Sequence, residues 1–274
     1  MLFIMFTKHL EGWDLPQIMA GLKSAGVEGA DLCVRPGYPV NPENAPTELP
    51  KAAKQFADEG LCIPLITTPG DFTDPSVDYA ESLYAAAGEA GVKLLKLGYW
   101  YMEDDGYWAT LDRCRRKLEG FAKLSEKTGV KTLVHNHSGN TMGLNSAAAM
   151  QLMQGFDPAH VGVFTDPGHL SIVGEPIPLA LDMVKEYMAA VALKDLIKKQ
   201  FERDGKLVWQ IDMMPLGMGF GDMDTLFTLL YKQGFPGPVS FHCEYHWMPP
   251  ESVIDQCRID VRFIRSRIAA LGLG

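Results

Sequence analysis

Histidine and carboxylate residues gather at three points of this chain, each directly after a short apolar run. Five of the seven histidines belong to these points, which read His135-Asn136-His137, Asp166-Pro167-Gly168-His169 and His242-Cys243-Glu244-Tyr245-His246. Residues two apart on a strand face the same side, so the paired side chains at a strand end can turn toward one point. Imidazole and carboxylate groups together suit zinc, manganese, iron or cobalt. The pattern therefore predicts a divalent-metal site.

The elements that must position these residues follow from a regular alternation along the chain. Short runs rich in Leu, Val, Ile and Phe predict eight strands, at residues 2–6, 29–34, 61–67, 92–98, 132–135, 161–165, 189–194 and 238–243. Stretches with helical spacing follow the strands, at residues 14–24, 48–59, 77–90, 107–128, 146–154, 177–185, 223–233 and 252–270. Glycine just before the next strand, as in Ala25-Gly26-Val27, suits a left-handed helix cap.

Eight strand–helix units favour an α/β fold that closes into a (β/α)8 TIM barrel, as a single domain over residues 1–274. The longest irregular piece, residues 195–221, is predicted to be a long loop after the seventh strand. In such barrels the chemistry lies where strands end and the following loops begin. The last four strand ends carry most of the polar residues. The first four supply His9, Arg35 and Trp100, which we expect to bind substrate.

Composition excludes several other classes of protein. The chain has 274 residues, and 47% of them are hydrophobic, which is enough to form a sizeable core. Because its formal net charge is -9, a nucleic-acid partner is not expected. Its five cysteines are odd in number and scattered, which argues against a disulfide framework and favours a reducing compartment. No segment predicts a signal peptide or a membrane helix. We expect a cytoplasmic protein with no membrane partner, unless an export signal preceded this sequence.

Six segments, in order, resemble the xylose-isomerase-like TIM barrels, a superfamily of sugar-phosphate isomerases and epimerases. They are FTKHL, DLCVRPG, HNHSG, FTDPGHL, VALKDL and GDMDTLFTLLYKQGFPGPVSF. The resemblance spans nearly the whole chain. The His135-Asn136-His137 segment is similar to an HNH subgroup that also includes inosose dehydratase-like members.

The resemblance implies a metal-ligand set, from which this chain departs. Relatives hold a metal with Glu, Asp, His and Glu at the ends of strands five to eight. Asp166 matches the Asp; the two Glu positions are His135 and His242, and Ala192 replaces the His. The resemblance thus implies a metal held by His135, Asp166 and His242. With fewer oxygen ligands, Mn, Zn, Co or Fe is favoured over Mg. No organic cofactor is indicated.

The same resemblance implies proton abstraction next to a carbonyl group. We expect Glu244 or His169 to act as base or acid and Lys194 to stabilise a substrate oxygen. His137 and His169 join the residues expected to bind substrate. Structural roles stay open as alternatives: the histidines as strand caps, Asp166 as a turn residue, Lys194 at a solvated loop start, and Trp100 as packing. The glycines of residues 217–221 are only a weak phosphate-binding signal.

The predicted function is a metal-assisted isomerase or epimerase of a sugar, keto-sugar or polyol. The alternatives are a lyase or dehydratase acting on a keto-sugar, inosose or 3-keto-glycoside, and a non-catalytic sugar-binding relic. The DNA-repair endonuclease branch of the superfamily is a poor match, because this acidic chain lacks an evident basic face. The sequence does not decide the sugar, its phosphorylation, the metal, epimerisation against elimination, or whether the chain forms a homo-oligomer.

Overall fold

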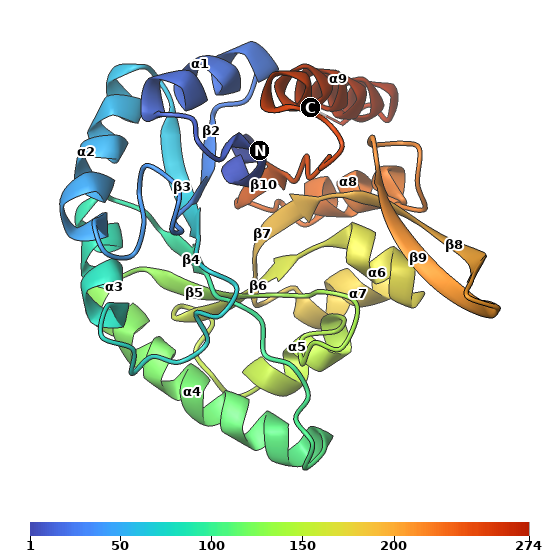
Figure 1. Ribbon diagram of the computed structural model, residues 1–274, viewed down its shortest axis with the longest axis horizontal. Helices are drawn as coiled ribbons and strands as arrows, with labels where there is room; N and C mark the ends of the chain where they lie inside the picture. Colours follow the sequence, from blue (N-terminus) through green and yellow to red (C-terminus); the bar gives the residue numbers. More distant parts are fainter. Residues whose placement is uncertain (274) are drawn as a thin grey trace.

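A closed barrel of eight parallel strands forms the centre of the computed structural model, which describes residues 1–273 (Figure 1). The strands follow the order β1-β10-β7-β6-β5-β4-β3-β2 around the barrel. Their bounds are β1 Leu2–Phe6, β2 Gly29–Cys33, β3 Cys62–Thr67, β4 Leu94–Lys96, β5 Lys131–His135, β6 Val161–Thr165, β7 Met188–Leu193 and β10 Pro238–Phe241. The predicted TIM barrel is confirmed, and each predicted strand coincides with one of these.

Helices cover the outside of the barrel (Figure 1). The eight predicted ones are α1 Leu15–Ala25, α2 Ala45–Asp58, α3 Ala80–Glu89, α4 Tyr107–Thr128, α5 Ser146–Met153, α7 Ile177–Val184, α8 Met223–Lys232 and α9 Pro250–Ala270. Two short helices were not predicted: the 3-10 helix η1 Thr7–Leu10 and α6 Pro167–Val173. Over residues 1–273, none of the helices has the length and apolar composition needed to cross a bilayer.

The long loop predicted for residues 195–221 is wrong over most of its length. Strands β8 Asp195–Arg203 and β9 Lys206–Met214 form an antiparallel hairpin that projects from the barrel (Figure 1). The two turn residues, Asp204 and Gly205, both have positive φ, 52° and 72°, as a tight two-residue hairpin turn requires. The many charged residues of this segment suggested a loop. They lie instead on a two-stranded ribbon that projects into solvent and does not pack against the barrel over most of its length.

Side-chain alternation along the strands places the site at one end of the barrel. An apolar layer fills the interior, made of Ile4, Leu65, Leu94, Leu133, Phe164, Ala190 and Ala192. Two residues further along the strands the same inward direction recurs, and there the side chains are polar and buried: Thr67, Lys96, His135, Asp166, Lys194 and His242. This second layer lies at the carboxyl ends of the strands and forms the floor of the barrel mouth.

Candidate active site at the barrel mouth

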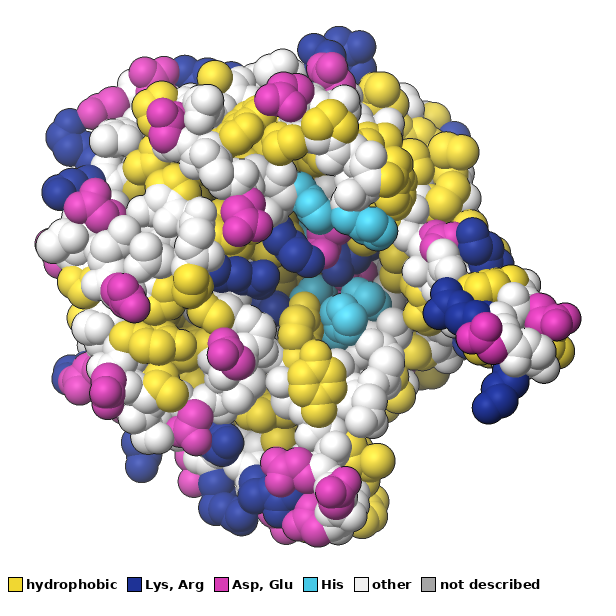
Figure 2. All heavy atoms as spheres, in the orientation of Figure 1, with side chains coloured by type: hydrophobic (Ala, Val, Ile, Leu, Met, Phe, Trp, Pro, Cys, Tyr) yellow, Lys and Arg dark blue, Asp and Glu magenta, His cyan; other side chains and the backbone are white. Residues whose placement is uncertain are grey.

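Lys194, directly after β7, is the centre of the polar cluster at the mouth. Its Nζ lies 3.0 Å from Glu244 Oε1, 3.4 Å from Asp166 Oδ2 and 3.2 Å from His169 Nε2. The neighbouring strands of β7 in the barrel are β6 and β10, so Asp166 and His169 approach from one side and Glu244 from the other. The three side chains predicted to be catalytic therefore converge. Figure 2 shows basic, acidic and histidine side chains gathered in the hollow at the centre of the molecule.

The charges of this cluster are set by its ion pairs. Burial lowers the pKa of Lys194, but the carboxylates of Glu244 and Asp166 outweigh this and hold that pKa above its usual value. Burial raises the pKa of Glu244, but Lys194, His242 and Lys8 outweigh it and hold it well below the usual range. At neutral pH the pair is thus an ammonium ion facing a carboxylate. Lys8 Nζ, 2.7 Å from Glu244 Oε2, contacts the other oxygen of that carboxylate.

His135 and His169 are buried neutral imidazoles with defined hydrogen-bond partners. Burial, more than any neighbouring charge, holds the pKa of each well below its usual value. His169 Nδ1 lies 2.8 Å from the Ser138 hydroxyl, while Nε2 faces the Lys194 ammonium, which can only donate. Nε2 of His169 therefore carries the lone pair. On His135, Nε2 lies 3.1 Å from Asp166 Oδ2 and Nδ1 lies 3.0 Å from the Tyr99 hydroxyl, so Nε2 carries the proton.

His137 and His242 border the same cluster. The His137 ring packs against that of His169, with 3.8 Å between ring centroids and 39° between the ring planes, and burial lowers the pKa of His137 to about 4. His242 stands between two carboxylates, with Nε2 3.3 Å from Asp31 Oδ2 and Nδ1 3.4 Å from Glu244 Oε1. Both histidines thus lie at the mouth.

The strand ends of the first half of the barrel contribute unequally. Arg35 donates from Nε to the Thr68 carbonyl at 2.9 Å, and its guanidinium lies 5.7 Å from the centre of the Phe6 ring. His9 is half-buried in η1, and burial lowers its pKa against the opposing effect of Glu244. Trp100 is not brought into the site. Its ring is part of the main hydrophobic core, and its indole N–H donates to the Thr73 carbonyl, so the packing alternative holds for this residue.

Three residues of the mouth were not predicted from the sequence: Asp31, Lys96 and Ser138. Asp31 is fully buried and accepts hydrogen bonds from Thr67 Oγ1 at 2.6 Å and from Ser240 Oγ at 3.1 Å. A usable signal was present for Lys96, which stands two residues after Leu94, an inward apolar position. Polar residues at that spacing after an apolar run point into the mouth.

The residues present do not fit the predicted metal ion. Among residues 1–273, no group of three or more His, Cys, Asp and Glu side chains is arranged to hold one. His135 contacts Asp166, but His242 turns Nε2 toward Asp31. The Lys194 ammonium already faces both Asp166 and Glu244. Two unit charges 4 Å apart repel by about 4 kcal/mol at an effective dielectric of roughly 20, and a divalent ion doubles this. The predicted ligand set of His135, Asp166 and His242 is therefore not formed.

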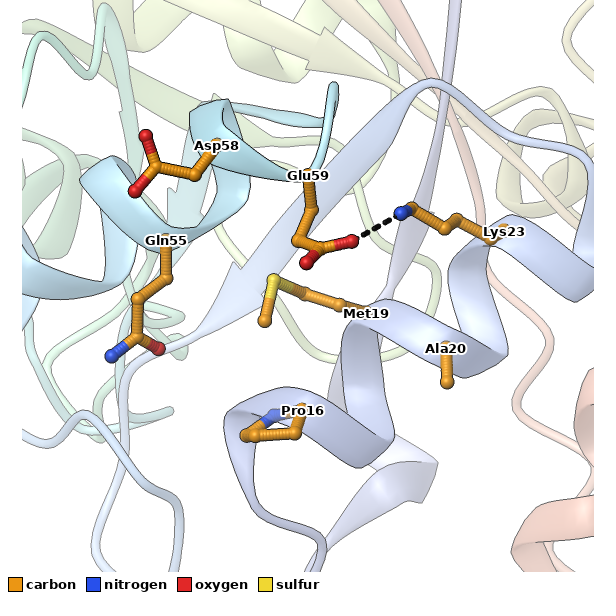
Figure 3. A pocket seen from close by; sticks show the side chains of 7 residues that line it. All are labelled: Pro16, Met19, Ala20, Lys23, Gln55, Asp58 and Glu59. Atoms are coloured by element: carbon orange, nitrogen blue, oxygen red, sulfur yellow. Dashed lines mark hydrogen bonds and ion pairs between the residues drawn. The ribbon is translucent and has the colours of Figure 1, made fainter.

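A second hollow, of about 490 Å³, lies outside the barrel between α1 and α2 (Figure 3). It is lined by Pro16, Met19, Ala20, Lys23, Gln55, Asp58 and Glu59. Its ion pair between Lys23 and Glu59 is half-exposed, and it contains no buried polar group aimed inward. The polar mouth of the barrel is therefore the better candidate for chemistry.

The chain belongs to the xylose isomerase-like TIM barrel family, whose model matches residues 19–267. Comparison with curated protein sequences finds no match. Among similar solved structures, an IOLI protein with a zinc atom is 16% identical, with a TM-score of 0.77 and coverage of 97% of this chain and 99% of that one. An L-ribulose 3-epimerase is 15% identical, with a TM-score of 0.76 and coverage of 98% and 95%. A probable 3-DHS dehydratase from Bacillus anthracis is 14% identical, with a TM-score of 0.70 and coverage of 97% and 99%.

Proposed function

We propose that this protein is an isomerase or epimerase of a small carbohydrate, acting by proton transfer at the carbon next to a carbonyl group. In this proposal the positive charge that opposes the developing enolate is the Lys194 ammonium. The observation that carries it is the 3.2 Å separation of His169 Nε2 from Lys194 Nζ. When substrate displaces this contact, the imidazole lone pair and the ammonium can face a C–H bond and the oxygen on the adjacent carbon.

Each group has a role that its surroundings support. His169 accepts the proton at Nε2, and the Ser138 hydroxyl fixes the ring through Nδ1. Lys194 donates a hydrogen bond to the substrate oxygen, where charge develops in the transition state. Asp166 and Glu244 hold Lys194 in place and protonated.

Isomerisation or epimerisation is favoured over elimination by the two-sided arrangement. His169 follows β6 and Glu244 follows β10, so two proton-accepting groups flank Lys194 from opposite neighbouring strands. Two bases on opposite sides of one carbon allow a proton to leave one face and return to the other. An epimerase and a dehydratase both occur among the similar structures, so the fold itself does not choose.

The test is proton exchange with solvent in a panel of free and phosphorylated ketoses in D2O, followed by mass spectrometry and NMR. We expect deuterium on the carbon next to the carbonyl and a product isomeric with the substrate. His169→Gln and Lys194→Met each remove one group, and each should slow the exchange by about 10²- to 10³-fold. Lys54→Met, an exposed lysine on α2, serves as the control that keeps the rate.

Two outcomes would count against this function. A product lighter by one water, with an enone absorbance, would show a dehydratase instead. Exchange that survives in both His169→Gln and Lys194→Met would show that the chemistry lies elsewhere.

A further inference from the structure

Lys96, the last residue of β4, is a buried amine that the proposed proton transfer does not use. Its side chain is 1% exposed, and Nζ has no hydrogen-bond partner among residues 1–273. The described residues also give it no ion pair, whereas Lys194 has two. Its Nζ lies over the face of the Tyr99 ring, 3.8 Å from the ring centre. A lysine buried without a counter-charge is costly to a fold, so its presence at the mouth calls for a function.

The position of Lys96 ties it to the same site. In the barrel register it pairs with Thr67 on β3 and Leu133 on β5, which places its side chain in the polar layer beside His135. Tyr99, whose ring lies against Nζ, reaches His135 Nδ1 with its hydroxyl, and His135 contacts Asp166. One chain of contacts therefore joins Lys96 to the cluster around Lys194.

The pKa values of the two lysines of the mouth are shifted in opposite directions. Burial, helped by the nearby Arg35 and Lys194, lowers the pKa of Lys96 well below its usual value. Lys194 is held as an ammonium by its carboxylates. Environments that shift two pKa values apart in this way allow one group to act as a nucleophile or base and the other as an acid. An amine that is neutral and desolvated beside other cations is the usual form of a lysine that attacks carbonyl carbon.

We propose that Lys96 is a covalent nucleophile whose Nζ forms an imine with the carbonyl carbon of a ketose substrate bound at the barrel mouth. This rests on the proposed function, because it needs a carbonyl compound in that site. The Nζ lone pair forms the C–N bond while the carbonyl oxygen takes up a proton. The nitrogen then loses a proton, the C–O bond breaks, and the oxygen leaves as water after a second protonation. The net reaction consumes one ketone, one neutral amine and one proton, and yields one iminium ion and one water.

In this form of the reaction Lys194 donates to the carbonyl oxygen only until that oxygen departs, and the iminium nitrogen then replaces it as the electron sink, so that proton loss gives an enamine. The positive iminium nitrogen withdraws electrons from the adjacent C–H bond, so the proton taken by His169 becomes more acidic. Lys194, held protonated beside Glu244, is the donor available to the departing oxygen. No oxidant, reductant or additional reactant is needed, and hydrolysis by water reverses the step and releases the product.

The experiment is reductive trapping with borohydride in the presence of dihydroxyacetone, read by intact-mass spectrometry and peptide mapping. The wild-type protein should gain the mass of one ketose less one oxygen atom, and the modified peptide should contain Lys96. Lys96→Met should lose this adduct, and Lys54→Met should keep it. Mapping on the wild-type protein identifies the modified lysine even if a variant folds poorly.

The failures of the two proposals are distinguishable. An adduct on Lys194, a spread over exposed lysines, or no adduct overturns the imine. Deuterium exchange that depends on His169 but persists in Lys96→Met would keep the proton transfer and also overturn the imine. Mapped labelling of Lys96 without any exchange would keep the imine and overturn the proposed function.

Discussion

At the scale of single residues, the mouth is organised by two lysines with opposite surroundings. Lys194 lies against Glu244 and Asp166, and it occupies the space between carboxylates in which a metal ion would otherwise be expected. Ala192, two residues earlier on the same face of β7, is part of the apolar interior layer and offers no ligand. The alanine at position 192 and the ion pairs of Lys194 thus both agree with a mouth in which an ammonium group, and not a metal ion, lies between the carboxylates.

Lys96→Met should stabilise the protein, and more at pH 7 than at pH 9. Between its lowered pKa and the ordinary value of 10.5, Lys96 is neutral when folded and protonated when unfolded. The unfolded chain then binds one more proton, so the free energy of unfolding of the wild type rises with pH by about 1.4 kcal/mol per unit. Methionine removes the free-energy cost of deprotonating Lys96 on folding. The stabilisation that it brings should therefore decrease as the pH approaches 10.5. Urea unfolding at the two pH values measures it, and an equal loss of stability at both would show a charged, well-partnered lysine.

At the scale of elements, the segment after β7 is held by one buried carboxylate. Asp195 accepts hydrogen bonds from the backbone N–H groups of Gly217 and Gly219 at 2.9 Å, of Gly221 at 2.8 Å and of Leu196 at 3.1 Å. The glycines that gave a weak phosphate signal therefore surround an anion of the chain itself. This arrangement closes the base of the β8–β9 hairpin against the barrel.

Asp195→Ala should lower the free energy of unfolding by about 2–4 kcal/mol, because four backbone donors lose a charged acceptor. Gly219→Ala tests the same contact from the other side, since an added Cβ would lie 2.2 Å from Asp195 Oδ1. Gly70→Ala is the matched control, because a Cβ there would meet nothing within 4 Å. Thermal unfolding of the three variants gives the comparison. Equal midpoints for Gly219→Ala and Gly70→Ala would contradict this account of the loop.

At the scale of the whole molecule, a buried histidine at the mouth makes the free energy of unfolding depend on pH. Burial lowers the pKa of His137 to about 4 from an ordinary 6.5, so the unfolded chain binds more protons between these values. The free energy of unfolding should therefore fall as the pH drops through this window, by up to about 1.4 kcal/mol per unit for this residue. Urea unfolding from pH 7 to pH 4 should show a shallower fall for His137→Gln. His246→Gln, which removes an exposed histidine, should keep the wild-type slope; equal slopes for both variants would contradict the assignment.

Much of the fold could be predicted because barrel strands and helices carry local patterns. The runs at 2–6 and 161–165 and the helix at 107–128 were predicted to the residue. The hairpin was missed because its strands are largely solvated on both faces. Charged residues therefore interrupt the alternation of apolar and polar side chains by which a strand is predicted. Its Asp204-Gly205 turn was a local signal that the composition of the segment overshadowed.

The site could be predicted only in part, because its partners come from different strands. The strand-end positions of His135, Asp166, Lys194 and Glu244 followed from the pattern of runs. Their pairing depends on the register of β6, β7 and β10, which no local pattern records. Trp100 was misassigned since an aromatic residue after a strand serves packing as readily as stacking.

Whether Lys194 or a metal ion carries the positive charge at the mouth is tested most directly by calorimetric titration of Zn²⁺ and Mn²⁺ into chelator-treated protein. We predict no stoichiometric binding to the wild type. Binding of one equivalent of metal that disappears in His135→Ala and in Asp166→Ala would contradict this metal-free account. It would support the ligand set that the sequence suggested.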